Sequence, residues 1–382
     1  MKKHIPYGRQ QILDEDIREV QRILQSDFIT TGPVSYEFEA ALAKSVGAKF
    51  AVTFNSGTSA LHAAYFALDL KAGTEFLTTP ITFVATANAG LYQGFKPVFC
   101  DIEPDTGNMD CTALEELITE YTRFIVPVHY GGHPADLEIL YQIADKHHLK
   151  IIEDGSHALG ARYKNRKIGD CSFSEMTTFS FHPVKHITTG EGGAVTTNDE
   201  YYYKRLKQFR NHGITKDDLQ HESEGDWYYE MQHLGFNYRL TDFQAALGLS
   251  QLKRLDQNIR SRREIAAFYY QEFGDSPYFH LPAERDYVQS SYHLYPIRLK
   301  EKLIPDKRKI FTRLREEKLG VQTHYIPVYR QPYYLEQGFG NIHKPKAETF
   351  YHSEISIPMY HSLTEEDQED VVNRIRSVFE TL

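Results

Sequence analysis

The sequence predicts an α/β protein, with a large domain built on a mostly parallel sheet flanked by helices and a smaller C-terminal α+β domain. Between about residues 50 and 200, short β-branched or aromatic runs alternate with longer helical patterns, as in βαβ units. After residue 240 the alternation stops, and a long helical pattern begins. The chain has 382 residues, which exceeds the size at which one hydrophobic core stops growing. Two domains are therefore expected.

The large domain is expected to contain seven strands and at least four helices. The apolar runs predicted as strands are 50–54, 76–79, 97–101, 124–128, 151–154, 177–181 and 194–197. The helical patterns between them are 58–68, 82–92, 112–120 and 134–147. Ligands of open α/β sheets bind at the carboxyl ends of the strands, so functional side chains are expected there.

The C-terminal part begins with one helix predicted over residues 242–273, whose apolar positions recur at helical spacing. HLYPIRL and VQTHYIPV are predicted strands, with a helix over 306–317 between them. The last helix starts after Thr364, and Asp367 completes a capping-box pattern. We place the large domain at residues 1–250 and the small domain at 251–382.

Composition excludes several classes of function. A net charge of −9, without a long basic run, disfavours a nucleic-acid binder. The first residues, MKKHIPY, lack the apolar segment of a signal peptide, and no stretch is long enough to span a membrane, so a cytoplasmic protein without a membrane partner is expected. Three cysteines without CxxC spacing and 18 scattered histidines predict neither a disulfide nor a metal site.

A phosphate-binding turn is predicted at NSGTSALH, which follows the first strand and opens a helix. Gly57, Thr58 and Ser59 would present backbone amides and hydroxyls at the helix N-terminus, where anions bind readily. By itself, a simple capped helix accounts better for this segment, because Ser and Thr are common N-caps.

Asp154, in IIEDGSHALG, stands at the carboxyl end of an apolar strand. A carboxylate in this position could hold a protonated pyridine nitrogen, although a helix cap accounts for the residue equally well. His157 follows three residues later and could lie beside the same ring or have a structural role.

Lys185, in TTFSFHPVKHITTGEGGAVTTN, lies between two predicted central strands, where an amine is poorly solvated. Desolvation lowers the pKa of such an amine, so that its neutral form can make a Schiff base. Ser180 precedes it on the strand and could bind a phosphate, and Phe83, in TPITFVATANAG, could stack on a flat ring. Together with the turn and Asp154, these residues converge on one edge of the sheet and predict a pyridoxal-phosphate site.

Motifs along nearly the whole chain resemble the DegT/DnrJ/EryC1/StrS sugar aminotransferases, which are fold-type I pyridoxal-phosphate enzymes. They include TGPVSYEFE, FNSGTSALHAA, IIEDGSHALGARY, FSFHPVKHITTGEGGAV and GFNYRLTDFQ. The resemblance implies that Lys185 holds the cofactor, that Asp154 pairs with the pyridine nitrogen and that Phe83 stacks on the ring. It places the phosphate at Gly57, Thr58, Ser59 and Ser180. It also implies that Asn237 reaches the cofactor of a second subunit, in a homodimer with shared active sites.

Within this family, PITFVATAN, SYHLYPI and VQTHYIPVYRQPYY resemble the enzymes that aminate C4 of a UDP-linked 4-keto-6-deoxy-N-acetylhexosamine in pseudaminic acid formation, with L-glutamate as the expected donor. By this likeness the sugar pocket is lined near the N-terminus and in a C-terminal segment, namely by Tyr7, Phe28, Ile29, Thr30, His324, Tyr325, Ile326 and Pro327.

Three alternatives stay open: a keto sugar carried on dTDP or GDP, an ordinary amino-acid aminotransferase, and a non-catalytic sensor with the same fold. A sugar dehydratase is disfavoured, because by family resemblance such enzymes have histidine at the position of Lys185.

Overall fold

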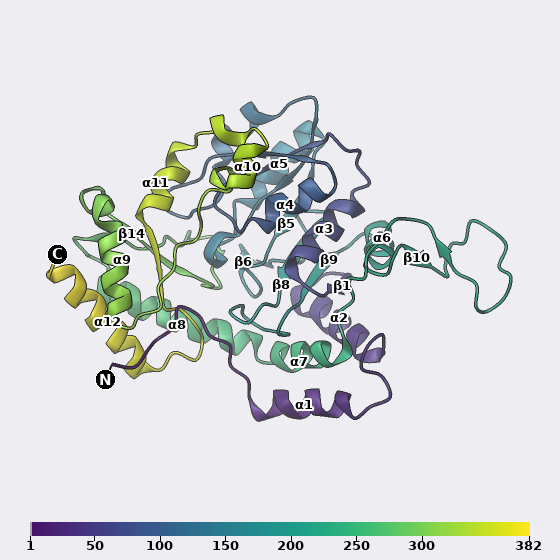
Figure 1. Ribbon diagram of the computed structural model, residues 1–382, viewed down its shortest axis with the longest axis horizontal. Coiled ribbons are helices and arrows are strands. Elements are labelled where there is room, and N and C mark those ends of the chain that lie inside the picture. The colour runs from purple at the N-terminus through teal and green to yellow at the C-terminus, as the bar shows by residue number, and fades with distance from the viewer. Residues whose placement is uncertain (1) are drawn as a thin grey trace.

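A computed structural model describes residues 2–382 and places a seven-stranded sheet at the centre of the large domain (Figure 1). The spatial order is β1-β9-β8-β5-β4-β2-β3; β9 runs antiparallel to both neighbours, and the other pairs are parallel. The strands are β1 (Phe50–Phe54), β2 (Glu75–Thr78), β3 (Lys96–Phe99), β4 (Thr122–Val126), β5 (Lys150–Asp154), β8 (Met176–Ser180) and β9 (Gly193–Thr197). All seven predicted strands and the mostly parallel sheet are confirmed.

Helices cover both faces of this sheet, because the strands carry apolar side chains on both faces and each face must be shielded from water. Alternate residues of one strand enter different cores: Ala51 packs in one, and Val52 in the other. The first core includes side chains of α2 (Pro33–Val46), α5 (Leu137–His147) and α7 (Asp242–Leu252). The second includes side chains of α3 (Gly57–Ala67), α4 (Ala85–Tyr92) and α6 (Glu200–Arg210).

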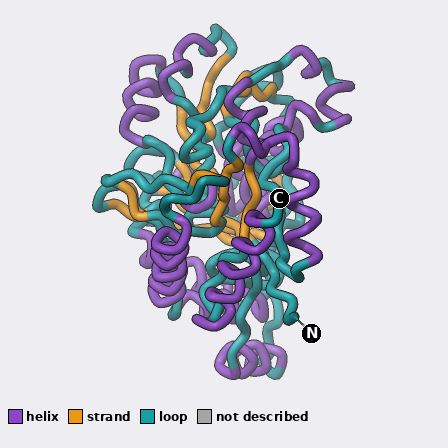
Figure 2. Tube along the Cα trace, turned by 90° about the vertical axis from the view of Figure 1, so that its left-hand side faces the viewer, coloured by secondary structure: helices purple, strands orange, loops and turns teal. Residues whose placement is uncertain are grey.

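The C-terminal part has its own core around a three-stranded antiparallel sheet. Its order is β12 (Phe279–His280), β14 (Tyr295–Leu299) and β15 (Glu354–Ile357), and α8 (Leu255–Phe273), α9 (Lys307–Glu316) and α12 (Glu365–Glu380) contribute to its core. Ile5 packs into this core as well, so the N-terminal segment crosses to the C-terminal part. Figure 2 shows strands in the interior of the molecule with helices around them. The division at residue 250 stays a prediction.

The remaining helices and strands lie outside these two sheets. They are α1 (Asp14–Leu24), α10 (Pro332–Glu336), α11 (Pro345–Ser353), a small sheet of β13 (Val288–Gln289), β6 (Arg162–Tyr163) and β7 (Arg166–Lys167), and a hairpin of β10 (Ile214–Thr215) and β11 (Glu230–Met231). This hairpin forms an arm, residues 212–236, that projects away from the body of the molecule (Figure 1). Among the described residues, no helix combines the length and apolar character that a membrane crossing requires.

The helix predicted over residues 112–120 is wrong. The chain forms only two short 3-10 turns there, Cys111–Ala113 and Glu115–Leu117, and becomes extended at Ile118. The hydroxyl of Thr119 donates to the carboxylate of Glu75 at 2.6 Å, which is a contact that periodicity does not reveal. At Thr119 this hydrogen bond to a distant residue therefore stands in place of a further turn of helix.

The single helix predicted over residues 242–273 is also wrong, because α7 and α8 are separated at Lys253 and Arg254. Neither residue is Pro or Gly, so the sequence contains no usual break signal. Arg254 instead binds the buried carboxylate of Asp16 at 2.8 Å, which ties the break to α1.

The predicted strand VQTHYIPV makes only one bridge, from Gln322 to Ser356. The next amide that could extend the ladder, that of His324, donates instead to the side chain of Glu354 at 2.8 Å. At the last helix, Thr364 caps as predicted, but the carboxylate of Asp367 accepts from Lys3 rather than closing a capping box.

Candidate functional site

A cavity of about 570 Å³ lies at the carboxyl ends of the central strands, where open α/β sheets bind ligands. Its walls come from the strand ends, from the N-terminal segment and from the C-terminal part, and its volume falls within the range of small-molecule sites. Ten predicted site residues line it: Tyr7, Gly57, Thr58, Phe83, Asp154, His157, Ser180, Lys185, His324 and Tyr325.

The N-terminus of α3 forms one end of the cavity, with Ser56, Gly57 and Thr58 opposite Ser180 of β8. A Cβ atom on Gly57 would approach the Cβ of Ser180 to 2.9 Å, so only glycine allows this close passage of the two segments. Hydroxyls next to a helix N-terminus suit a phosphate, because the helix dipole is positive there.

Ser59 belongs to the same turn but has a different contact. Its hydroxyl donates to Asn55 at 2.6 Å, and its amide donates to the hydroxyl of Ser56 at 3.1 Å, which completes a capping box. Ser56 therefore lines the cavity in place of Ser59.

Asp154 is buried at the end of β5, with 3% of its surface exposed. One carboxylate oxygen accepts from the hydroxyl of Thr86 at 2.7 Å, and the other accepts from the amide of Ser156 at 3.1 Å. These donors fix the direction of the carboxylate and leave it able to accept a further proton donor inside the cavity.

Lys185 enters the cavity from the loop between β8 and β9. Burial lowers the pKa of its amine to about 7, with Asp154 opposing and Arg262 reinforcing this shift. Near neutral pH a large share of the amine is therefore uncharged, which is the form that attacks a carbonyl.

Several histidines line the cavity around this amine, and His293 is one that was not predicted from the sequence. His293 Nε2 lies 3.4 Å from Lys185 Nζ, and the His293 ring lies 4.4 Å from that of His157. Burial lowers the pKa of both imidazoles well below the ordinary value, so they stay neutral. His293 belongs to HLYPIRL, which was predicted as a strand, and to SYHLYPI, which resembles the sugar aminotransferases, but neither observation assigned a role to this histidine.

Two aromatic residues continue the wall on the side of the C-terminal part. The Tyr325 hydroxyl lies 3.1 Å from His157 Nε2, and the ring of Tyr7 lies 5.5 Å from that of His324. Burial lowers the pKa of His324 to about 3, so this side of the cavity carries no positive imidazole at neutral pH. Phe83 is 58% exposed, and its ring centroid lies 6.2 Å from that of Tyr325. Because more than half of Phe83 is exposed, its ring is free to stack on a ligand.

Other predicted residues lie outside the cavity of a single chain. Phe28, Ile29 and Thr30 are exposed on the loop after α1, Asn237 is exposed at the base of the arm, Ile326 is 44% exposed, and Pro327 is buried away from the cavity. Their roles stay predictions.

The residues that meet in the cavity fit pyridoxal 5′-phosphate. Lys185 supplies an amine with a lowered pKa, Asp154 supplies a fixed carboxylate for the ring nitrogen, and the α3 turn with Ser180 supplies a phosphate cradle. The fold and this site define a fold-type I pyridoxal-phosphate-dependent aminotransferase.

The chain belongs to the DegT/DnrJ/EryC1/StrS aminotransferase family, whose profile matches residues 10–376. It is 41% identical to the UDP-4-amino-4,6-dideoxy-N-acetyl-beta-L-altrosamine transaminase of Campylobacter jejuni strain 81-176, over 98% of each chain. The structure of Helicobacter pylori PseC, an aminotransferase involved in the biosynthesis of pseudoaminic acid, matches with a TM-score of 0.94 and 40% identity over 100% of both chains. Spr1654 of Streptococcus pneumoniae, solved in PLP and PMP forms, matches with a TM-score of 0.92 and 31% identity over 99% of each chain.

Proposed function

We propose that this aminotransferase converts a UDP-linked 4-keto-6-deoxy-N-acetylhexosamine into its 4-amino sugar, with L-glutamate as amino donor. The observation that carries the chemistry is the presence in one cavity of the Lys185 amine, whose pKa burial lowers to about 7, and of the fixed carboxylate of Asp154. The sugar class rests on the similarity to a transaminase named for that product, over nearly the whole of both chains.

When bound, pyridoxal phosphate supplies an electron sink for the carbanion of each half reaction. Gly57, Thr58 and Ser180 would hold its phosphate, and Asp154 would keep a proton on its ring nitrogen. The Lys185 amine is the general base that takes the α-proton of the donor, and in the second half reaction it moves a proton at C4 of the sugar. Its pKa of about 7 suits both directions of transfer at neutral pH.

The sugar would enter from the side formed by Tyr7, His324 and Tyr325. Low pKa values keep the His157 and His324 imidazoles uncharged, and burial raises that of the Tyr7 hydroxyl, so this wall offers neutral hydrogen-bonding groups and aromatic faces. Such a surface offers hydrogen-bond partners to the uncharged hydroxyl and amide groups of a sugar.

The test compares keto sugars in single turnovers. Purified enzyme is first loaded with L-glutamate, which should bleach its visible absorbance, and is then mixed with UDP-, dTDP- or GDP-linked 4-keto-6-deoxy sugars. Return of the absorbance with the UDP-N-acetyl sugar, and a 4-amino product by mass spectrometry, are expected. Faster return with a 2-oxo acid other than 2-oxoglutarate, the product of the donor, would replace the proposal with an amino-acid aminotransferase.

We also propose a homodimer in which Asn237 completes the site of a second copy. Asn237 is exposed and lies outside the cavity of its own chain, at the base of the projecting arm. The arm exposes large apolar side chains, with Trp227 72% and Leu234 79% exposed, which a partner surface would cover.

Shared sites predict complementation between inactive variants. Lys185→Ala and Asn237→Ala chains, mixed and reassembled, place one intact site in each hybrid dimer, so activity should recover to about one quarter of the wild type. Absence of recovery, with hybrids verified by mass spectrometry, would show that Asn237 serves its own chain. Full activity of Asn237→Ala alone would show that it serves no site.

We infer a cytoplasmic location. All three cysteines are unpaired and buried, which agrees with a reducing compartment.

A further inference from the structure

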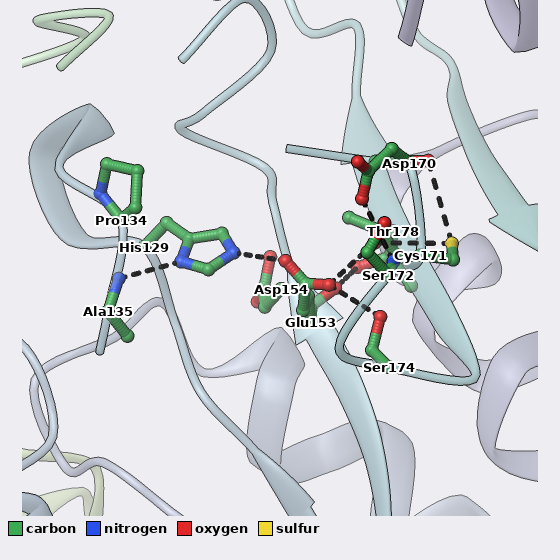
Figure 3. A network of polar contacts seen from close by, with 12 residues as sticks. His129, Pro134, Ala135, Glu153, Asp154, Asp170, Cys171, Ser172, Ser174 and Thr178 are labelled. Atoms are coloured by element: carbon green, nitrogen blue, oxygen red, sulfur yellow. Dashed lines mark hydrogen bonds and ion pairs between the residues drawn. The ribbon is translucent and has the colours of Figure 1, made fainter. Parts of the chain in front are cut away.

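Behind Asp154 lies a buried polar pair, His129 and Glu153, that the mechanism above does not use (Figure 3). Their side chains are 0% and 3% exposed, and His129 Nε2 lies 2.8 Å from a Glu153 carboxylate oxygen. The other Glu153 oxygen accepts from the hydroxyls of Ser174 at 2.5 Å and Thr177 at 3.2 Å. The carboxylate is therefore held by three donors.

The contacts of His129 define its tautomer. The amide of Ala135 donates to His129 Nδ1 at 3.0 Å, so this nitrogen carries the lone pair. The proton then lies on Nε2, which donates to Glu153. A neutral, fixed imidazole thus links the segment after β4 to β5.

The same two segments are joined through their backbones next to Asp154. The amide of His129 donates to the carbonyl of Asp154 at 3.1 Å, and the amide of Asp154 donates to the carbonyl of Pro127 at 2.9 Å. Successive side chains of a strand point to opposite faces, so Glu153 faces away from the cavity while Asp154 faces into it. Any influence of Glu153 on the cavity must pass through the position of the strand end.

Stability alone accounts poorly for this pair. Removing a carboxylate from water is costly, and apolar side chains of similar volume are often as stable as a buried polar pair. Here Glu153 stands one residue before Asp154, the carboxylate proposed for the cofactor ring. Its contact with His129 joins the two segments whose backbones are also hydrogen-bonded next to Asp154.

We propose that His129 and Glu153 are positioning residues that fix Asp154 for the ring nitrogen of the cofactor, an inference that rests on the pyridoxal-phosphate site described above. They touch neither cofactor nor substrate and act through the backbone of residues 153 and 154. Loosening the pair should weaken the contact of Asp154 with the ring nitrogen more than it weakens binding of the rest of the cofactor.

The experiment measures binding of two aldehyde-free ligands to the apoenzyme. 4′-Deoxypyridoxine 5′-phosphate retains the ring nitrogen, and its deaza analogue has a CH group there; neither reacts with Lys185. The wild type should prefer the first ligand, and Glu153→Gln should reduce this preference about tenfold, since a hydrogen bond to a charged group is lost or misaligned. A merely structural role would weaken both ligands equally.

His129→Gln is the conservative variant, because its amide can accept from Ala135 and donate to Glu153, and it should retain most of the preference. Ser174→Ala, which removes one donor to Glu153, replaces Glu153→Gln if that variant does not fold. Asp16→Asn is the matched control: Asp16 is also fully buried and hydrogen-bonded, but it links α1 to α7, and its loss should leave the preference unchanged.

An unchanged preference in both Glu153→Gln and Ser174→Ala, with a discriminating wild type, would overturn this inference and leave the cofactor site intact. A wild-type protein that binds neither ligand would overturn the cofactor site and this inference together.

Discussion

The two ends of the cavity differ in how the chain builds them. At the cofactor end, Gly57, Asp154, Ser180 and Lys185 follow the ends of strands in one sheet, so strand pairing alone brings them together. At the sugar end, Tyr7, His324 and Tyr325 come from irregular segments near the two termini, and five predicted residues stay outside the cavity of one chain. The proposed chemistry therefore depends on a sheet edge, while the proposed sugar specificity depends on loops and on a proposed second copy.

The largest effect is expected from removing the amine at the cofactor end of the cavity. Lys185→Ala should lower kcat by at least about 10⁴-fold, because the covalent anchor and the general base are lost together. The measurement is amination of the keto sugar with L-glutamate, followed by mass spectrometry. Lys146→Ala, an exposed lysine on α5 that pairs with Glu115, should behave as the wild type. Similar activity in both variants would remove Lys185 from the mechanism.

The cofactor end should also show an unusual pH dependence. Burial lowers the Lys185 pKa from 10.5 to about 7, so the amine loses its proton as the pH rises through 7. At pH 7 its neutral fraction should exceed that of an ordinary lysine about 10³-fold. Pulsed acylation of the apoenzyme, read by peptide mass spectrometry, should show Lys185 labelling that rises between about pH 6 and 8. A midpoint near 10 would show that the amine is solvated and charged.

A smaller effect at the same end concerns the carboxylate. Asp154→Asn should lower kcat about 10²-fold, because an uncharged amide stabilises the protonated ring nitrogen less well. Thr86→Val removes one donor at 2.7 Å and should cost less, about tenfold. Single-turnover rates with L-glutamate measure both. A larger loss in Thr86→Val than in Asp154→Asn would indicate that Thr86 acts independently of Asp154.

The smallest effect is expected at the sugar end of the cavity, from loss of the Tyr325 hydroxyl. Tyr325→Phe removes the hydroxyl at 3.1 Å from His157 and should raise KM for the keto sugar about fivefold, with the glutamate half reaction nearly unchanged. Tyr329→Phe is the matched control, because its hydroxyl binds Glu348 and it does not line the cavity. A change confined to the glutamate half reaction would reassign Tyr325 to the cofactor end.

Local pattern was sufficient where an element is apolar and regular. The seven central strands were predicted because short β-branched runs that alternate with helical patterns are typical of buried strands in a parallel sheet. Local pattern failed where a hydrogen bond to a distant residue sets the backbone conformation. Thr119 donates to Glu75 where a helix was predicted, and Arg254 binds Asp16 at the break between α7 and α8. The amide of His324 donates to the side chain of Glu354 instead of extending a strand.

The sequence alone was sufficient to predict the fold class and the family, because these follow from periodicity and from motifs contiguous in the chain. The same motifs gave the roles of Lys185 and Asp154, which stay predictions. The tertiary structure was needed to show that His293 stands next to the Lys185 amine and that Ser56, rather than Ser59, lines the cavity. It was also needed to show that His129 and Glu153 are hydrogen-bonded behind Asp154. These contacts join residues from separate turns and strand ends, and their hydrogen bonds and burial are set by packing, which no local pattern encodes.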